Sequence, residues 1–239
     1  SVSRLRGDTQ TRHGLIRLDK NERATAFPNF FFEQLVSELT SDHLTAYPET
    51  EVLYERLAQL HDISTKNIML TAGSDMAIRH CFDLFVNPGG EVVVLDPTFA
   101  MVDIYCQLYG AEKQGVGYDN QLRLDFERLH KVIGPKTELI VIANPNSPTG
   151  TLISEADLHG ILIKAAQLQV PVLVDEAYYG FCKQTAVSML GEHGNLIVSR
   201  TFSKAYGLAG LRVGYLLAQA EISQLLYRFR PMYEINSMG

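Results

Sequence analysis

Two side chains suited to acid–base and covalent chemistry follow apolar segments of the sequence. Asp175 follows Val170–Val174, and Lys204 follows Leu196–Arg200 within a stretch of hydroxyl residues and glycines. A buried carboxylate without a partner costs several kcal/mol, so Asp175 needs a cation or hydrogen-bond donors. A lysine close to Arg212 in a partly dry pocket is suited to attack a carbonyl and form an imine. The two residues therefore predict amine chemistry on a carbonyl compound.

Other segments supply groups that would bind a ligand. Gly73 and Ser74 precede a predicted helix, where free backbone N–H groups hold a phosphate, although a Gly-Ser pair also simply caps helices. Phe99 is either a ring that stacks on a flat heteroaromatic ligand or part of the core. The stretch Asn144–Gly150 either directs amide hydrogen bonds or is only a loop. With the lysine, the acid and the arginine, these groups describe a site for a phosphorylated aromatic aldehyde, pyridoxal 5′-phosphate (PLP).

These groups must be positioned by alternating strands and helices, because short apolar, β-branched runs alternate with helical stretches from about Asn67 onward. This pattern is typical of an α/β fold whose sheet is covered on both faces, and parallel strands gather functional groups at their carboxyl ends. The expected strands are Asn67–Thr71, Glu91–Leu95, Glu138–Ala143, Val170–Val174, Leu196–Arg200 and Arg212–Ala218. The expected helices are Val52–Leu60, with Leu53, Leu57 and Leu60 on one face, Ser74–Phe85, Phe99–Tyr109, Phe126–Lys131, Ser154–Leu168 and Ala205–Leu208.

Size, charge and cysteine usage exclude several classes of protein. The chain has 239 residues, and its 21 Lys+Arg against 27 Asp+Glu give a formal charge of −6, which disfavours nucleic-acid binding. Cys81, Cys106 and Cys182 are widely spaced, so neither a disulfide framework nor a metal site is expected, and a cytoplasmic location fits best. The apolar runs are too short to span a bilayer, so no membrane attachment is expected.

Six segments follow one another in a family's order over nearly the whole chain. They are Leu18–Glu22, Ala46–Glu49, Ala72–Asp75, Asn144–Gly150, Asp175–Tyr178 and Thr201–Gly214. In these segments the sequence resembles the fold-type I PLP-dependent aminotransferases of class I/II, and among them the histidinol-phosphate aminotransferase-like branch. The resemblance implies a three-layer sandwich with a mostly parallel mixed sheet. It also implies an N-terminal arm and the start of the packing region over residues 1–50 and a PLP-binding large domain over 51–239, with the small C-terminal domain absent or truncated.

The resemblance assigns roles to particular residues. It implies that Lys204 holds PLP as an internal aldimine and then moves a proton, that Asp175 pairs with the pyridinium nitrogen, and that Tyr178 contacts the ring oxygen O3′. The other assigned residues are Gly73, Ser74, Thr201, Ser203 and Arg212 at the phosphate, Phe99 on the ring face, Tyr47 at the phosphate of a partner subunit, and Asn21 at the substrate.

One position departs from the family pattern. The family has Asn immediately before Pro-Thr-Gly, whereas this chain has Ser147 there and Asn146 one place earlier. Asn146 is predicted to take the contact with O3′, and a weaker contact through Ser147 is the alternative.

The implied activity is the PLP-dependent transfer of an amino group between an amino acid, or a histidinol phosphate-like amine, and a 2-oxo acid, by a homodimer with small-molecule substrates. Two alternatives remain open: a PLP-dependent decarboxylase or lyase on the same scaffold, and a non-catalytic or truncated aminotransferase-like module. A Rossmann dehydrogenase is excluded, since no G-x-G-x-x-G follows the first strand.

Overall fold

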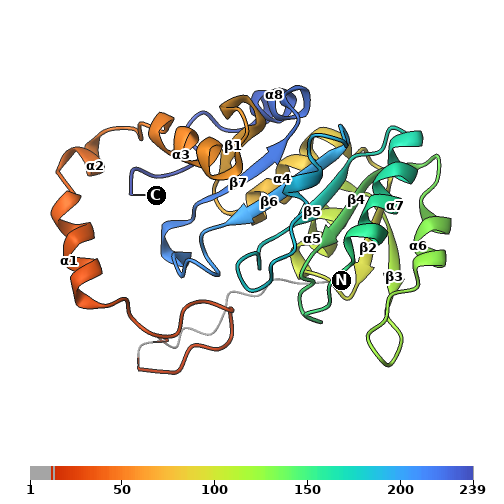
Figure 1. Ribbon diagram of the computed structural model, residues 1–239, viewed down its shortest axis with the longest axis horizontal. Helices are drawn as coiled ribbons and strands as arrows, with labels where there is room; N and C mark the ends of the chain where they lie inside the picture. The colour runs from red at the N-terminus through yellow and green to blue at the C-terminus, as the bar shows by residue number, and fades with distance from the viewer. Residues whose placement is uncertain (1–11, 13, 239) are drawn as a thin grey trace.

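A seven-stranded mixed sheet forms the centre of the protein in a computed structural model that describes residue 12 and residues 14–238 (Figure 1). The N-terminal arm predicted from the sequence therefore lies partly outside the described residues. The strands are β1 (Ile68–Thr71), β2 (Glu91–Asp96), β3 (Glu112–Gly117), β4 (Thr137–Ala143), β5 (Val172–Asp175), β6 (Leu196–Thr201) and β7 (Gly214–Ala218). Their order across the sheet is β1-β7-β6-β5-β4-β2-β3. Strand β7 runs antiparallel to both of its neighbours, β1 and β6, whereas the other strand pairs are parallel, which confirms the predicted mostly parallel mixed sheet.

Helices cover both faces of this sheet. They are α1 (Asn29–Glu38), α2 (Asp42–Thr45), α3 (Glu51–His61), α4 (Ser74–Phe85), α5 (Ala100–Tyr109), α6 (Phe126–Val132), α7 (Glu155–Gln167) and α8 (Ala220–Phe229), with short 3₁₀ turns η1 (Thr65–Asn67), η2 (Val187–Met189) and η3 (Ala209–Leu211). Alternate strand residues enter two separate cores: Met69 packs with residues of α4, α5 and α8, whereas Leu70 packs with residues of α3, α6 and α7. Both cores are apolar, so the strands read as continuous apolar runs rather than as an alternating pattern.

Local signals set several helix boundaries. Helix α4 begins and ends where the sequence predicts. The side chain of Ser154 caps α7 by accepting a hydrogen bond from the Asp157 N–H at 3.1 Å, which confirms the predicted helix start.

Three features differ from the sequence-based expectations. The helix predicted at Ala205–Leu208 is wrong: this segment is a turn with Gly207 at φ 72°, closed by a bond from the Leu208 N–H to the Phe202 carbonyl. Leu60 is 62% exposed, because α3 turns Tyr54 and Leu57 inward.

The third difference is strand β3, which was not predicted. It lies at the edge of the sheet and has the largely polar sequence Glu-Lys-Gln-Gly-Val-Gly, so it lacks the apolar run that marks the other strands.

Helices α1 and α2 lie to one side of the sheet (Figure 1) and bury none of their residues.

Among the described residues, no helix has the length and apolar character needed to cross a membrane.

Antiparallel strand β7 begins at the edge where β1 and β6 end, and Gly214 pairs with the last residue of each. A Cβ at Gly214 would lie 2.7 Å from the Arg200 carbonyl oxygen and from the carbonyl carbon of Gly73. Glycine therefore allows three backbone segments to meet beside the carboxyl ends of the parallel strands.

Replacing Gly214 by alanine is expected to lower the free energy of unfolding by about 1–3 kcal/mol, because the added methyl group has no space. Urea unfolding followed by circular dichroism measures the change. Gly210→Ala is the matched control, since its added methyl group meets nothing within 4 Å. A Gly214→Ala variant as stable as the wild type would contradict the close approach.

Candidate functional site

A cavity of about 470 Å³ opens at the carboxyl ends of the parallel strands. This is the edge where functional groups gather in parallel α/β sheets, and the volume is in the range of small-molecule sites. Its walls come from the turns after β1, β2, β4, β5 and β6, from the segment before β7, and from a segment near the N-terminus. The lining residues are Lys20, Glu22, Ser74, Asp75, Phe99, Ala143, Ser147, Asp175, Ala177, Tyr178, Thr201, Ser203, Lys204, Ala209 and Arg212.

Asp175 is the last residue of β5 and is 5% exposed. Its Oδ1 accepts a hydrogen bond from the Ser199 hydroxyl at 2.6 Å. Burial raises the pKa of Asp175 to about 6, although this bond and the Ala177 N–H act in the opposite direction. Within residue 12 and residues 14–238, no cationic side chain forms an ion pair with Asp175. The carboxyl group thus faces the cavity without the cation that the sequence led us to expect.

The amine of Lys204 lies in the same cavity and is held by the N-terminal segment. Its Nζ donates hydrogen bonds to the carbonyl oxygens of Lys20, at 2.9 Å, and Asn21, at 3.0 Å. The Asn21 side chain also donates to the hydroxyl of Tyr178 at 2.8 Å. The Tyr178 ring centre is 5.6 Å from the lysine Nζ. Asn21 therefore joins two cavity residues that come from separate strand ends.

A guanidinium and two hydroxyls form another wall of the cavity. Arg212 donates to the Ser203 hydroxyl at 3.4 Å and to the Ala72 carbonyl at 3.3 Å. The Thr201 hydroxyl donates to Ser203 at 3.0 Å. A Cβ at Gly73, where φ is 84°, would lie 2.8 Å from a guanidinium nitrogen, so glycine lets the arginine approach the backbone before α4. Together these groups offer the donors and positive charge that an anion requires.

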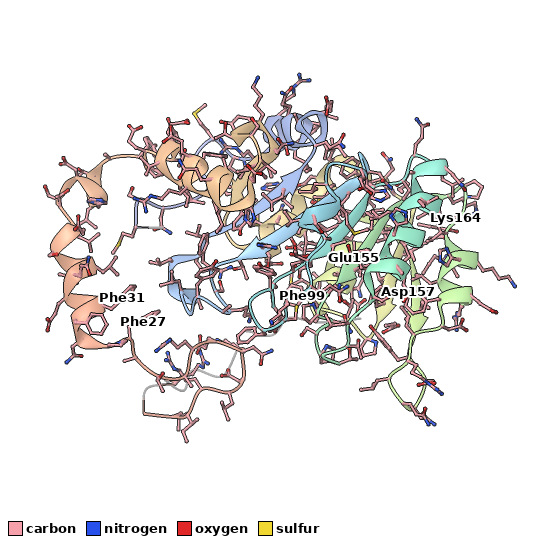
Figure 2. All side chains as sticks on the ribbon, in the orientation of Figure 1. Phe27, Phe31, Phe99, Glu155, Asp157 and Lys164 are labelled. Carbon is pink, nitrogen blue, oxygen red and sulfur yellow. The ribbon has the colours of Figure 1, made fainter. Side chains whose placement is uncertain are left out.

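Of the residues predicted to contact the cofactor ring, Phe99 lines the cavity and Asn146 does not. Phe99 lines the cavity at the start of α5 (Figure 2). Asn146 is 3% exposed and is absent from the lining, because its amide N–H groups bond to the Pro97 carbonyl and the Thr149 hydroxyl. The hydroxyl of Thr98 donates to its Oδ1. The amide joins its own loop to the turn after β2, and Ser147 lines the cavity instead.

Tyr47 lies outside the cavity of its own chain. It is 68% exposed and stacks on Tyr233 with the ring centres 3.8 Å apart. Of the residues singled out from the sequence, the structure thus gathers Ser74, Phe99, Asp175, Tyr178, Thr201, Ser203, Lys204 and Arg212 around the cavity, with Gly73 and Asn21 in contact with them, and leaves Tyr47 and Asn146 out.

Sequence reasoning missed a buried ion pair beside Asp175. Glu176 accepts two hydrogen bonds from the Arg200 guanidinium, at 3.0 and 2.8 Å, and both side chains are almost fully buried. The sequence did contain a signal for this ion pair. Glu176 follows one apolar strand and Arg200 ends the next, and the ends of neighbouring parallel strands lie side by side.

A second missed residue, Glu234, comes from the C-terminal segment. Its carboxylate accepts the Ala72 N–H at 3.1 Å and contacts the buried Nε2 of His80 at 2.9 Å. The backbone of Ala72 thus donates its N–H to Glu234 and accepts at its carbonyl a hydrogen bond from Arg212. No local sequence pattern predicts the contact between Glu234 and Ala72, because the two residues are 162 positions apart in the sequence.

Comparisons with known proteins agree with one another. A family model described as aminotransferase class I and II matches residues 14–237. The chain is 39% identical over 228 residues to a histidinol-phosphate aminotransferase of Dehalococcoides mccartyi, which covers 95% of this chain and 62% of the relative.

Solved structures show the same fold. Histidinol-phosphate aminotransferase from Sinorhizobium meliloti in complex with pyridoxal 5′-phosphate is similar with a TM-score of 0.80 at 26% identity, covering 92% of this chain and 60% of that one. L-Threonine-O-3-phosphate decarboxylase from Porphyromonas gingivalis shares the fold with a TM-score of 0.74 at 22% identity, covering 90% of this chain and 66% of that one. The chain spans less than two thirds of the length of the relatives.

The raised pKa of Asp175 predicts a pH-dependent cost to stability in the ligand-free chain. Between about pH 4 and pH 6 the carboxyl ionises in the unfolded chain but stays protonated when folded, so stability falls as the pH rises through the folded pKa of about 6. Asp175→Asn removes this loss. Its gain in unfolding free energy over the wild type is expected to be about 1–2 kcal/mol larger at pH 7.5 than at pH 5, measured by urea denaturation. A gain that does not change with pH would argue against a buried, uncompensated carboxyl.

Proposed function

Because the chain belongs to the aminotransferase class I and II family, we propose that it binds PLP and takes part in the transfer of an amino group from an amine to a 2-oxo acid. The observation that carries the proposal is the meeting of two groups in one cavity. The buried carboxyl of Asp175 lacks a cationic partner among the described residues, and the amine of Lys204 opens into the same space. A cofactor with a protonated ring nitrogen and an aldehyde has the two features that such a pair would bind.

The remaining walls fit the rest of PLP. The hydroxyls of Thr201 and Ser203, the guanidinium of Arg212 and the backbone at Gly73 offer donors for a phosphate. The ring of Phe99 offers a flat apolar face for the pyridine. Asp175 would accept the ring N–H and keep that nitrogen protonated, because an ion pair in a dry site strengthens as water is excluded. The residues present therefore fit the group.

Bound PLP supplies an aldehyde that condenses with primary amines and a ring that accepts the electron pair released at the substrate carbon. Lys204 is the residue proposed to bind the cofactor between turnovers and, once displaced, to carry a proton at its Nζ. The carbonyls of Lys20 and Asn21 accept hydrogen bonds from that amine and would hold it in position. The N-terminal segment is therefore proposed to position the base as well as to cover the cavity.

Tyr178 is proposed to hydrogen-bond the cofactor oxygen O3′, and the Asn21 amide bonded to its hydroxyl would keep the phenol in place. Ser147 is the neighbour available for a second contact, because the Asn146 amide is already bonded to the Pro97 carbonyl and the Thr149 hydroxyl. Asn21 remains a proposed substrate contact.

The proposed amine is histidinol phosphate or a related amino compound, supported by the name of the curated relative that is 39% identical. We also propose a homodimer. Tyr47 is exposed and lies outside the cavity of its own chain, as expected for a residue that reaches a partner's phosphate. The apolar residues that α1 exposes, such as Phe30 at 72%, would be buried in such an assembly.

The cofactor and the nucleophile can be tested together. After mixing the chain with PLP and reducing with borohydride, peptide mass mapping is expected to find a pyridoxyl group on Lys204. Lys204→Ala should lose this label and the visible absorbance band. Lys20→Ala is the matched control, since Lys20 lines the same cavity. Labelling that follows Lys20, or that is unchanged in Lys204→Ala, would overturn the assignment.

The reaction is tested by supplying PLP, L-histidinol phosphate and 2-oxoglutarate and measuring glutamate. Glutamate above the level formed by Lys204→Ala is expected. Because decarboxylases share this fold, amino-acid substrates should be screened in parallel for released CO₂. Release of CO₂ without amino transfer would replace the proposal by a decarboxylase, and cofactor labelling with neither product would leave a PLP-binding module.

A further inference from the structure

A cluster of two histidines and a glutamate lies apart from the cavity and shares no residue with it. His159 lies on α7, whereas Glu192 and His193 lie in the turn that leads into β6. The cavity forms at the carboxyl ends of the parallel strands, but Glu192 and His193 lie where β6 begins. The cluster therefore needs an explanation independent of the proposed activity.

The three side chains present their ligand atoms to one another. The Nε2 of His193 is 2.9 Å from the Nδ1 of His159, and the rings meet edge-on with their centres 4.8 Å apart. One potential ligand atom from each of the three residues lies within 4.8 Å of the others. His193 is 7% exposed, whereas His159 and Glu192 are exposed, so one ligand is fixed in the protein and the site is open to solvent.

Charge at this position favours a cation. Within the described residues, neither His159 nor Glu192 forms an ion pair with lysine or arginine. Glu155, which projects from α7 one turn before His159 (Figure 2), lines the same shallow hollow as His159 and Glu192.

We infer that His159, Glu192 and His193 bind one Zn²⁺ or a similar transition-metal ion. Two imidazoles and one carboxylate form a ligand set that suits zinc, whereas Mg²⁺ and Ca²⁺ prefer oxygen ligands. Water or Glu155 would complete a four-coordinate site.

Zinc–nitrogen bonds of about 2.0–2.1 Å in a tetrahedral site separate the two nitrogens by about 3.3 Å. The observed 2.9 Å must therefore widen by a few tenths of an ångström, which rotation of the exposed His159 side chain supplies. The bound ion would join α7 to the turn before β6.

The test is calorimetric titration of the untagged, chelator-treated chain with Zn²⁺, together with Co²⁺ titration followed by visible absorbance. We expect one ion per chain and a tetrahedral cobalt spectrum. His159→Ala removes an exposed ligand without disturbing the core and should weaken binding at least about tenfold. Glu192→Gln should weaken it in the same direction.

His43→Ala is the matched control, because His43 is a histidine on α2 outside the cluster. Lys204→Ala should bind Zn²⁺ like the wild type, so the outcome is independent of the PLP site. Zn²⁺ should also raise the melting temperature of the wild type but not of His159→Ala. The inference fails if no stoichiometric binding is seen, or if His159→Ala and the wild type bind equally.

Discussion

Asp175 is a carboxyl group held almost out of water at the end of β5, the central strand of the sheet, and its burial raises its pKa to about 6. The residues around the end of β5 differ in how they compensate the two buried acids there, Asp175 and Glu176. Glu176, the next residue, is paired with Arg200 and also accepts bonds from Thr185 and the Ala186 N–H. One of the two adjacent acids thus has a cationic partner within the protein. The other carries only hydrogen bonds and remains available to a cationic ligand.

The reversal of β7 provides the complementary positive charge. Because β7 runs antiparallel between β1 and β6, the segment leading into it returns to the edge where the parallel strands end. Arg212, at φ 55°, therefore reaches the backbone before α4. Gly73 and Gly214 are required there, since a Cβ at either would lie within 3 Å of a neighbouring group. Steric constraints on two glycines and the chain reversal together place a guanidinium in the wall of the cavity that Asp175 also lines.

Segments from both ends of the chain complete this edge of the sheet. Near the N-terminus, the carbonyls of Lys20 and Asn21 accept the hydrogen bonds of Lys204. Near the C-terminus, Glu234 bonds the Ala72 N–H. Such contacts span more than 150 residues of sequence, so they form only after the sheet has brought distant segments together. The positions of the Lys204 amine and of the turn before α4 therefore depend on segments from both ends of the described chain.

The sequence by itself determined the α/β class, most strand positions and the residues that line the cavity from the turns after the strands. These follow from local patterns: apolar runs of strand length, a capping serine before α7, and polar residues directly after each strand. Tertiary structure alone decided the rest. Edge strand β3 is polar, so no apolar run marks it. The Asn146 amide turns inward because the turn after β2 and its own loop together offer it three polar partners. Glu234 reaches Ala72, and His159 reaches His193, through long-range packing. A sequence pattern depends on residues close together along the chain. These contacts instead join groups that are far apart in the sequence, and the arrangement of strands and helices sets the distance between them.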